Sequence, residues 1–153
     1  LNRGNRHMIS NILIPVDGSD HSRKALELGC DMAKKYGAAV HLMHITESPI
    51  RDQTLVLGGA AVTFSASPQD LKRAGSKVLE YAREYAQNHG VKEVTTEVTG
   101  GSPAHRIVES AKDIHADMIV MGTRGLSDLA GLLVGSVSHK VTNMATCTCI
   151  TVR

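Results

Sequence analysis

A chain of 153 residues with a net charge of +2 and 42% hydrophobic residues has the size and composition of one soluble globular domain. Lys and Arg are spread along the chain, and there are no Trp, one Phe and three Tyr, which argues against a nucleic-acid-binding protein. No apolar run approaches the length that spans a bilayer, so we expect no membrane partner.

The first seven residues, LNRGNRH, precede Met8 and lack the apolar centre of a signal peptide. We expect residues 1–7 to be an appended or disordered leader, Met8 to be the native start, and residues 8–153 to form a single domain. The chain has three cysteines, an odd number, which favours reduced thiols in the cytoplasm over a disulfide framework.

The first part of the chain alternates between strand-like and helix-like segments. Residues 8–17 contain a short apolar run that predicts a buried strand. Residues 19–37 carry apolar positions at helical spacing, which predicts a helix with Ser19 or Asp20 as its N-cap. Residues 38–45 then predict a second strand.

Residues 46–66 have no clear period and contain one Pro and two Gly, so we predict a long functional or mobile loop. The next segment, residues 67–90, predicts a helix that opens at Ser67 as N-cap and Pro68 as first helical residue. Its expected inward-facing residues are Leu71, Ala74, Val78, Ala82 and Tyr85.

The remaining segments continue the same alternation. Residues 91–99 predict an edge strand, residues 102–116 a helix that opens with Ser-Pro, and residues 117–122 a wholly apolar central strand. After a glycine-containing segment, residues 136–145 predict a last helix and residues 147–153 a last strand.

This order of elements predicts an α/β fold of the Rossmann-like type, an open parallel five-stranded sheet with helices on both faces. The first and fourth strands are the most apolar and should lie side by side at the centre. Right-handed crossovers then give the strand order 3-2-1-4-5. Ligands of such sheets bind at the carboxyl ends of the strands where the winding reverses, here between Asp17 and Gly122.

The segment GTRGLSDLAGLLVGS, residues 122–136, begins at this predicted crevice. Gly122 and Gly125 allow main-chain N–H groups to approach an anion without an intervening side chain. Gly135 and Ser136 open the next helix, and we predict that Ser136 is its N-cap. The free amides of a helix N-terminus carry partial positive charge, so the segment suits a chain of phosphates. The alternative is that these are only turn glycines.

Nearby side chains extend this predicted site. Arg124 supplies positive charge and Ser138 a hydroxyl, while Asp17 suits a ribose hydroxyl pair or a metal ion. An equally weighted alternative is that Asp17 only forms a turn and helix cap. The end of the second strand, around His44 and Ile45, forms the expected third wall, where main-chain groups can read an adenine edge.

Two common nucleotide-binding motifs are missing from the sequence. The chain contains no G-x-x-x-x-G-K-[ST], so the glycine segment is not a P-loop. It also has no G-x-G-x-x-G after the first strand, which disfavours a dinucleotide site.

The spacing Gly122-x2-Gly125-x9-Gly135-Ser136 resembles the glycine signature of the ATP-binding branch of the universal stress protein family. The segments ILIPVDGSDHSRKAL, VHLMHITE and GSPAHRIVESAKDIHADMIVMGTRG are similar to that family's first strand and helix, second strand, and third helix with fourth strand. The similarity extends from Met8 to the end of the chain.

This resemblance implies an adenine nucleotide alpha hydrolase-like fold with sheet order 3-2-1-4-5. It implies ATP, ADP or AMP as ligand, accompanied by a divalent ion such as Mg²⁺, and a homodimer formed through the last strand, residues 147–153. No metal-binding residue is assigned. The residues it implies in nucleotide contact are Pro15, Asp17, Ile45, Met121, Gly122, Gly125, Gly135, Ser136 and Val137.

The leading hypothesis is therefore an ATP-binding, dimeric stress-response or signalling module in which the nucleotide orders the two loops and presents a surface to protein partners. No general base other than Asp17 or a capping carboxylate is placed to activate water, so we expect slow or no ATP hydrolysis. Two alternatives remain. One is a slow ATPase or nucleotidyl-transfer enzyme that uses Asp17 and a metal, and the other is a nucleotide-free structural dimer.

Overall fold

The computed structural model describes residues 8–47, 53–57, 60–64, 67–124 and 135–153. The helices and strands, in chain order, are β1 (Asn11–Pro15), α1 (Asp20–Tyr36), β2 (Ala39–Thr46), β3 (Gln53–Leu57), β4 (Ala60–Phe64), α2 (Pro68–Asn88), β5 (Val94–Gly100), α3 (Pro103–Asp113), β6 (Met118–Gly122), α4 (Ser136–Met144) and β7 (Thr148–Val152).

Five of the strands form one parallel sheet in the order β5-β2-β1-β6-β7. Counted along the chain, these strands have the order 3-2-1-4-5, which confirms the sequence prediction. The first and fourth of them, β1 and β6, pair at the centre, with Ile12 opposite Met118. The carboxyl ends of β1 and β6 therefore lie side by side, where the winding direction reverses.

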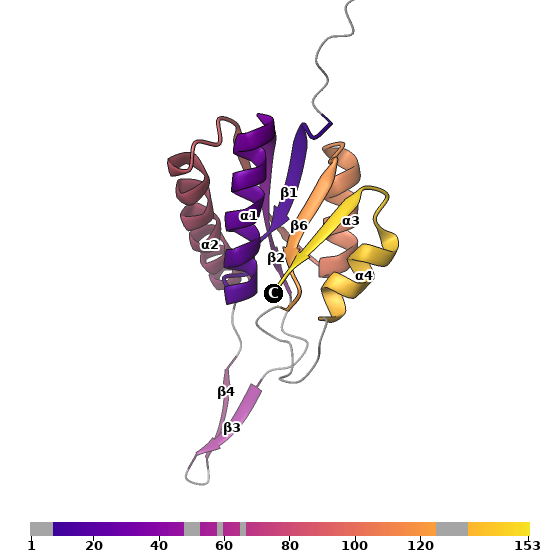
Figure 1. The fold of residues 1–153 in the computed structure, drawn as a ribbon. Helices are drawn as coiled ribbons and strands as arrows, with labels where there is room; N and C mark the ends of the chain where they lie inside the picture. The colour runs from indigo at the N-terminus through magenta and orange to yellow at the C-terminus, as the bar shows by residue number, and fades with distance from the viewer. Residues whose placement is uncertain (1–7, 48–52, 58–59, 65–66, 125–134) are drawn as a thin grey trace, which may run out of the picture.

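Helices cover both faces of the sheet, with α1 and α2 on one face and α3 and α4 on the other (Figure 1). Successive side chains of a strand point to opposite faces, so each central strand contributes to two cores. Ile12 and Ile14 pack in the core under α1 and α2. Leu13 and Ile119 pack in the core under α3 and α4.

The structure confirms most of the helix starts that the sequence predicts. Ser19 is the N-cap of α1 and its hydroxyl accepts the N–H of Ser22 at 3.2 Å. Ser67 caps α2 in the same way, with Pro68 as first helical residue. The prediction for α4 is wrong by one residue, because Gly135 is its N-cap and Ser136 is already helical.

The inward face of α2 also differs from the prediction. Its buried residues are Gly75, Leu79, Ala82 and Ala86, so only Ala82 of the expected stripe is buried. The cause is steric: a Cβ on Gly75 would lie 2.5 Å from Cδ2 of His44. Gly75 therefore lets α2 come close to β2, and Leu79, Ala82 and Ala86 are buried beside it, while Val78 and Tyr85 pack half-buried at the edge of the core.

The segment predicted as a long loop, residues 46–66, contains a separate antiparallel hairpin. Its strands β3 and β4 pair with Gln53 opposite Phe64 and Leu57 opposite Ala60. Figure 1 shows this hairpin extending away from the five-stranded sheet, beyond the carboxyl ends of its strands. The sequence analysis predicted a functional or mobile loop here and no strands, so it missed β3 and β4, which carry β-branched and apolar residues typical of strands.

The three cysteines are free thiols in different surroundings. Cys30 is fully buried on α1, and burial, together with the nearby Asp31, raises its pKa from 9.0 to about 12. Cys147 and Cys149 are half-buried at the last strand, and burial raises the pKa of both thiols. Because a thiolate is the reactive form, Cys30 should be the least reactive of the three.

We predict that iodoacetamide at pH 8 labels Cys147 and Cys149 slowly in the folded protein and leaves Cys30 unlabelled until denaturant is added. Mass spectrometry of the alkylated peptides measures this, with Cys30→Ser as control. Because the pKa of Cys30 is raised on folding, the stability that its neutral form contributes is complete below pH 9.0 and is lost as pH rises toward 12. Equal labelling of all three thiols in the folded protein would contradict the prediction.

Candidate functional site

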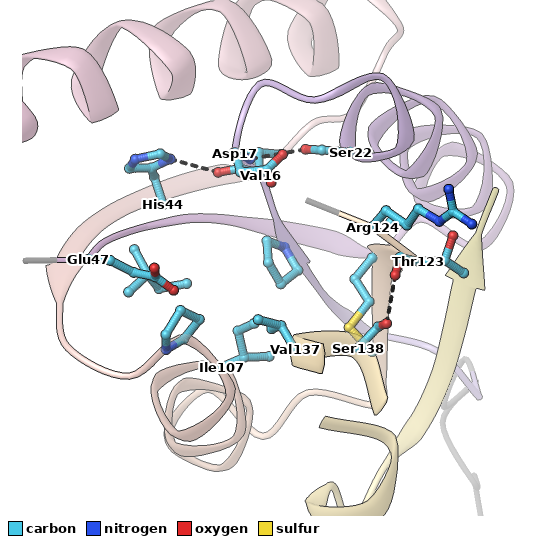
Figure 2. Close-up of a pocket in the computed structure, with 15 residues that line it drawn as sticks. Val16, Asp17, Ser22, His44, Glu47, Ile107, Thr123, Arg124, Val137 and Ser138 are labelled. Carbon is cyan, nitrogen blue, oxygen red and sulfur yellow. Dashed lines mark hydrogen bonds between the residues drawn. The ribbon is translucent and has the colours of Figure 1, made fainter. Parts of the chain in front are cut away.

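A cavity of about 280 Å³ lies at the carboxyl ends of β1, β2 and β6, at the predicted switch point (Figure 2). Of the residues proposed from the sequence, it is lined by Pro15, Asp17, Ile45, Met121, Gly122, Arg124, Val137 and Ser138. Gly135 and Ser136 adjoin it at the start of α4 but do not line it. Gly125 lies outside the described residues.

Several residues that line the cavity were not selected as site residues from the sequence. Glu47 follows β2 and Thr123 follows β6, and both come directly after strand ends that the prediction had placed at the crevice. A search of the residues just beyond each strand end would have found them. The others lie on or beside elements whose packing the sequence does not reveal, namely Val16, Ser22, Pro103 and Ile107.

The wall between β1 and β2 is built from backbone groups. The N–H of Val16 donates to the carbonyl of Met43 at 2.8 Å. The carbonyl of Val16 lies 2.8 Å from Nδ1 of His44. A carbonyl can only accept, so the Nδ1 of His44 carries a proton and donates it. Both polar groups of Val16 are therefore already paired.

The backbone of Ile45 has a different position. Met43 directs its carbonyl toward β1, and because alternate residues of a parallel strand direct N–H and C=O to the same side, Ile45 does so too. β1 ends at Pro15, opposite Met43. Among the described residues, no strand therefore lies beside Ile45 on this side, and its N–H and C=O face the cavity that it lines.

Asp17 forms the turn that leads from β1 into α1. Its Oδ1 accepts the N–H of Ser19 at 2.9 Å, and its own N–H donates to the hydroxyl of Ser22 at 3.1 Å. The interpretation of Asp17 as a turn residue is therefore correct, and the residue also lines the cavity. The turn fixes the carboxylate at the edge of the cavity.

Gly122 ends β6 beside the start of α1. A Cβ at this position would lie 2.8 Å from the backbone carbon of His21 and 2.9 Å from the N atom of Ser22. Real Cβ atoms do not approach backbone atoms this closely, so the absence of a side chain lets α1 pack against the end of β6. The role of Gly122 in anion approach stays a prediction from the sequence, and the structure shows this separate steric reason for a glycine.

The chain leaves the site at Arg124 and returns at Gly135, and the two ends are hydrogen-bonded. The N–H of Gly135 donates to the carbonyl of Thr123 at 2.6 Å. The hydroxyl of Ser138 donates to the same carbonyl at 2.9 Å. Ser138 is only 2% exposed, so its hydroxyl, expected from the sequence to contact a ligand, holds the two chain ends together.

α4 points its N-terminus toward the cavity, where Val137 forms part of the lining (Figure 2). Within the described part of the chain, no side chain caps the first amides of this helix. The unpaired N–H groups of a helix start carry about half a positive charge. Figure 2 also shows Glu47 and Arg124 on opposite sides of the cavity.

A resident metal ion has no dedicated ligands in the described part of the protein. No group of three or more His, Cys, Asp or Glu side chains there is arranged to hold one. No helix among the described residues is long and apolar enough to cross a membrane.

A family model for the universal stress protein family matches residues 8–153. The chain belongs to the universal stress protein family. The universal stress protein YxiE of Bacillus subtilis is 35% identical over 149 residues, which cover 95% of this chain and 100% of the relative. A universal stress protein of Methanocaldococcus jannaschii is 34% identical over 152 residues, covering 99% of this chain and 86% of the relative.

Solved structures of universal stress proteins share the fold. UspA from Lactobacillus plantarum superposes with a TM-score of 0.72 at 22% identity, covering 98% of this chain and 100% of that chain. A universal stress protein in complex with cAMP gives 0.70 at 23% identity, covering 95% and 97%. One from Archaeoglobus fulgidus in complex with dAMP gives 0.68 at 22% identity, covering 95% and 99%.

We predict that Gly122→Ala destabilises the protein by about 1–3 kcal/mol, because the added methyl group meets backbone atoms that cannot rotate away. Urea unfolding followed by circular dichroism measures the change. Gly100→Ala is the matched control, since this glycine also ends a strand but its added Cβ would make an ordinary contact at 3.5 Å. Equal loss of stability in the two variants would show that the close approach at Gly122 is not the cause.

Proposed function

We propose that this universal stress protein binds an adenine nucleotide, with ATP as the principal ligand, in the cavity between β1, β2 and β6. The observation that carries the proposal is the presence of two features in one cavity: backbone groups of Ile45 beside which no described strand lies, and the N-terminus of α4, whose first amides no described side chain caps. The first suits a planar base and the second an anion, and a nucleotide contains both.

The base-binding end of the proposed site is the wall formed by β1 and β2. Adenine presents a hydrogen-bond donor, N6, next to an acceptor, N1. The C=O and N–H of Ile45 form the complementary pair on one residue. Pro15 and Met121 supply apolar lining beside them. Asp17, held at the edge by its turn, is the group we propose for the ribose hydroxyls.

The phosphate-binding end is the start of α4. The backbone N–H groups of Ser136 and Val137 belong to the first turn of this helix, and anions bind favourably at such positions. Arg124 also lines the cavity and carries a full positive charge. Gly122, at the end of β6, lines the same cavity. The contribution of Gly125 stays a prediction from the sequence.

Mg²⁺ is proposed only as a companion of the phosphates. Because the described residues offer no ready-made group of metal-binding side chains, phosphate oxygens and water would supply most of its ligands.

Two solved relatives support the choice of an adenine nucleotide, since one is described in complex with cAMP and another with dAMP. On this basis we propose a cytoplasmic, nucleotide-dependent stress-response or signalling module. Nucleotide occupancy would change the surface near the cavity mouth and so its contacts with protein partners. The free thiols of the chain are compatible with a reducing compartment.

We predict that ATP at one hundred times its Kd stabilises ligand-stripped protein by about 2.7 kcal/mol, which raises the Tm by roughly 5–10 °C. Differential scanning calorimetry with and without Mg²⁺ measures the shift. GTP is the control for the base, because guanine reverses the donor and acceptor that face Ile45. A Tm that ATP leaves unchanged would refute the proposed function. ATP turnover that Asp17→Asn abolishes while binding persists would favour the enzyme alternative.

We also propose a homodimer that forms through β7, which is an edge strand of the sheet. The carbonyl of Val152 bonds to the chain after β6, so the backbone groups of Thr151 face the open edge. Such unpaired groups are a template for strand pairing between two chains. Thr151 is exposed, and its side chain is not part of either core.

We predict that Thr151→Pro dissociates the dimer, because proline removes the outward N–H and leaves the pairing with β6 in place. Analytical ultracentrifugation gives the mass of the wild type and variant, and far-UV circular dichroism checks that the variant is folded. Thr151→Ala keeps the N–H and should stay dimeric. A dimer that persists in folded Thr151→Pro would exclude this interface.

A further inference from the structure

Thr123 is a buried polar residue that the glycine signature gives no role. It follows β6 directly, is 4% exposed, and lines the cavity. No buried side-chain N or O atom in the described part of the chain lacks a hydrogen-bond partner. The partners of Thr123 come from three other segments of the chain, namely the starts of α1 and α4 and the end of β7.

The N–H and the hydroxyl of Thr123 both bond to the end of the sheet. Its N–H donates to the carbonyl of Val152 at 2.8 Å, and its Oγ1 lies 3.1 Å from the same carbonyl. Because a carbonyl only accepts, the hydroxyl of Thr123 donates there. Oγ1 then accepts from Nδ1 of His21, at 2.9 Å, which assigns a proton to that nitrogen.

The carbonyl of Thr123 accepts two bonds from the start of α4. One comes from the N–H of Gly135 at 2.6 Å and the other from the hydroxyl of Ser138 at 2.9 Å. With these, both lone pairs of the carbonyl are used. We call Thr123 and Ser138, with the hydrogen bonds that they make, the Thr123 clasp. It connects the ends of β6 and β7 with the first turns of α1 and α4.

The clasp fixes the place of α4 relative to the sheet. Gly135 is the N-cap of α4, so a hydrogen bond from its N–H to the end of β6 sets where the helix begins. Ser138 lies one turn later and adds a second bond to the same acceptor, which limits rotation of the helix about its axis. The first amides of the helix, those of Ser136 and Val137, are thereby held at the cavity.

We infer that Thr123 and Ser138 are positioning residues for phosphate binding: they align the first amides of α4 without contacting the ligand. This inference rests on the proposed function. Both hydroxyls are committed to protein carbonyls and both residues are almost fully buried, so neither is offered to a ligand. Amides that are already aligned bind an anion without a further ordering cost, which is why loss of the clasp should weaken phosphate binding.

The test compares AMP with adenosine, which differ by one phosphate, using isothermal titration calorimetry. Thr123→Val preserves the shape of the side chain and removes its hydroxyl, and Ser138→Ala removes the second bond to α4. In each variant we expect the Kd for AMP to rise about tenfold. The Kd for adenosine should stay within about twofold, because adenosine contacts only the base and ribose walls.

Two variants serve as controls. Thr123→Ser retains the hydroxyl and should bind AMP as the wild type does. Thr142→Ala removes another hydroxyl of α4, one that bonds only to carbonyls of its own helix, those of Ser138 and His139, and it should leave both Kd values unchanged. Equal losses for AMP and adenosine, or no loss for AMP in folded Ser138→Ala, would overturn the inference.

Amide hydrogen exchange of the ligand-free wild type separates this inference from the proposed function. The N–H of Gly135 should be protected by its bond to Thr123, and exchange at the rate of an unstructured chain would refute the clasp whatever the protein binds. Wild-type protein that binds neither AMP nor adenosine would instead refute the proposed function, and the effect on affinity with it.

Discussion

The parallel pairing of β1 with β6 is the constraint on which the arrangement of the site depends. The chain leaves β1 for α1 on one face of the sheet, whereas the chain that leaves β6 reaches α4 on the other face. The connections β1–α1 and β6–α4 leave neighbouring strands toward opposite faces of the sheet, so a space opens between them. The cavity at this point is therefore a consequence of strand order.

Close packing determines which residues can stand at this point. Gly122 is required where α1 meets the end of β6, and Gly75 is required where α2 meets the ring of His44. His44 in turn bonds to the carbonyl of Val16 and so fixes the chain just after β1. The walls of the cavity are thus held by close packing at two glycines and by side-chain hydrogen bonds to the main chain.

The sequence was sufficient to predict the strand order of the sheet and the location of the cavity, because both follow from elements that local signals identify. Apolar runs, Ser-Pro helix openings and the glycine at residue 37 are read directly from the chain, and Gly37 indeed ends α1 with a φ of 68°. The inward face of α2 was misjudged because hydrophobicity predicts burial of the large residues. In the structure Gly75, Leu79 and two alanines are buried, and at Gly75 the ring of His44 leaves no room for a side chain.

The same limit applies to the site. Glycine spacing identifies where a backbone approaches an anion, but it carries no information about which hydroxyl bonds to which carbonyl. Ser138 was therefore expected to face a ligand, and Thr123 was overlooked although it lies between two residues that were selected. Their pairing joins positions fifteen residues apart, which only the folded chain brings together. The hairpin of β3 and β4 was missed although a sequence signal exists, since Gly-Gly separates two five-residue runs of apolar and β-branched residues.

The last strand has one consequence for anyone who handles this protein in the laboratory. The carbonyl of Val152 accepts the N–H of Thr123, and the carbonyl of Arg153 accepts a hydrogen bond from Nζ of Lys24 on α1 at 3.2 Å. Purification handles and fluorescent fusions added behind Arg153 thus attach to a stretch of main chain that supports the mouth of the cavity. Handles placed before Met8 join the chain ahead of β1, at the amino end of the sheet, and leave that support intact.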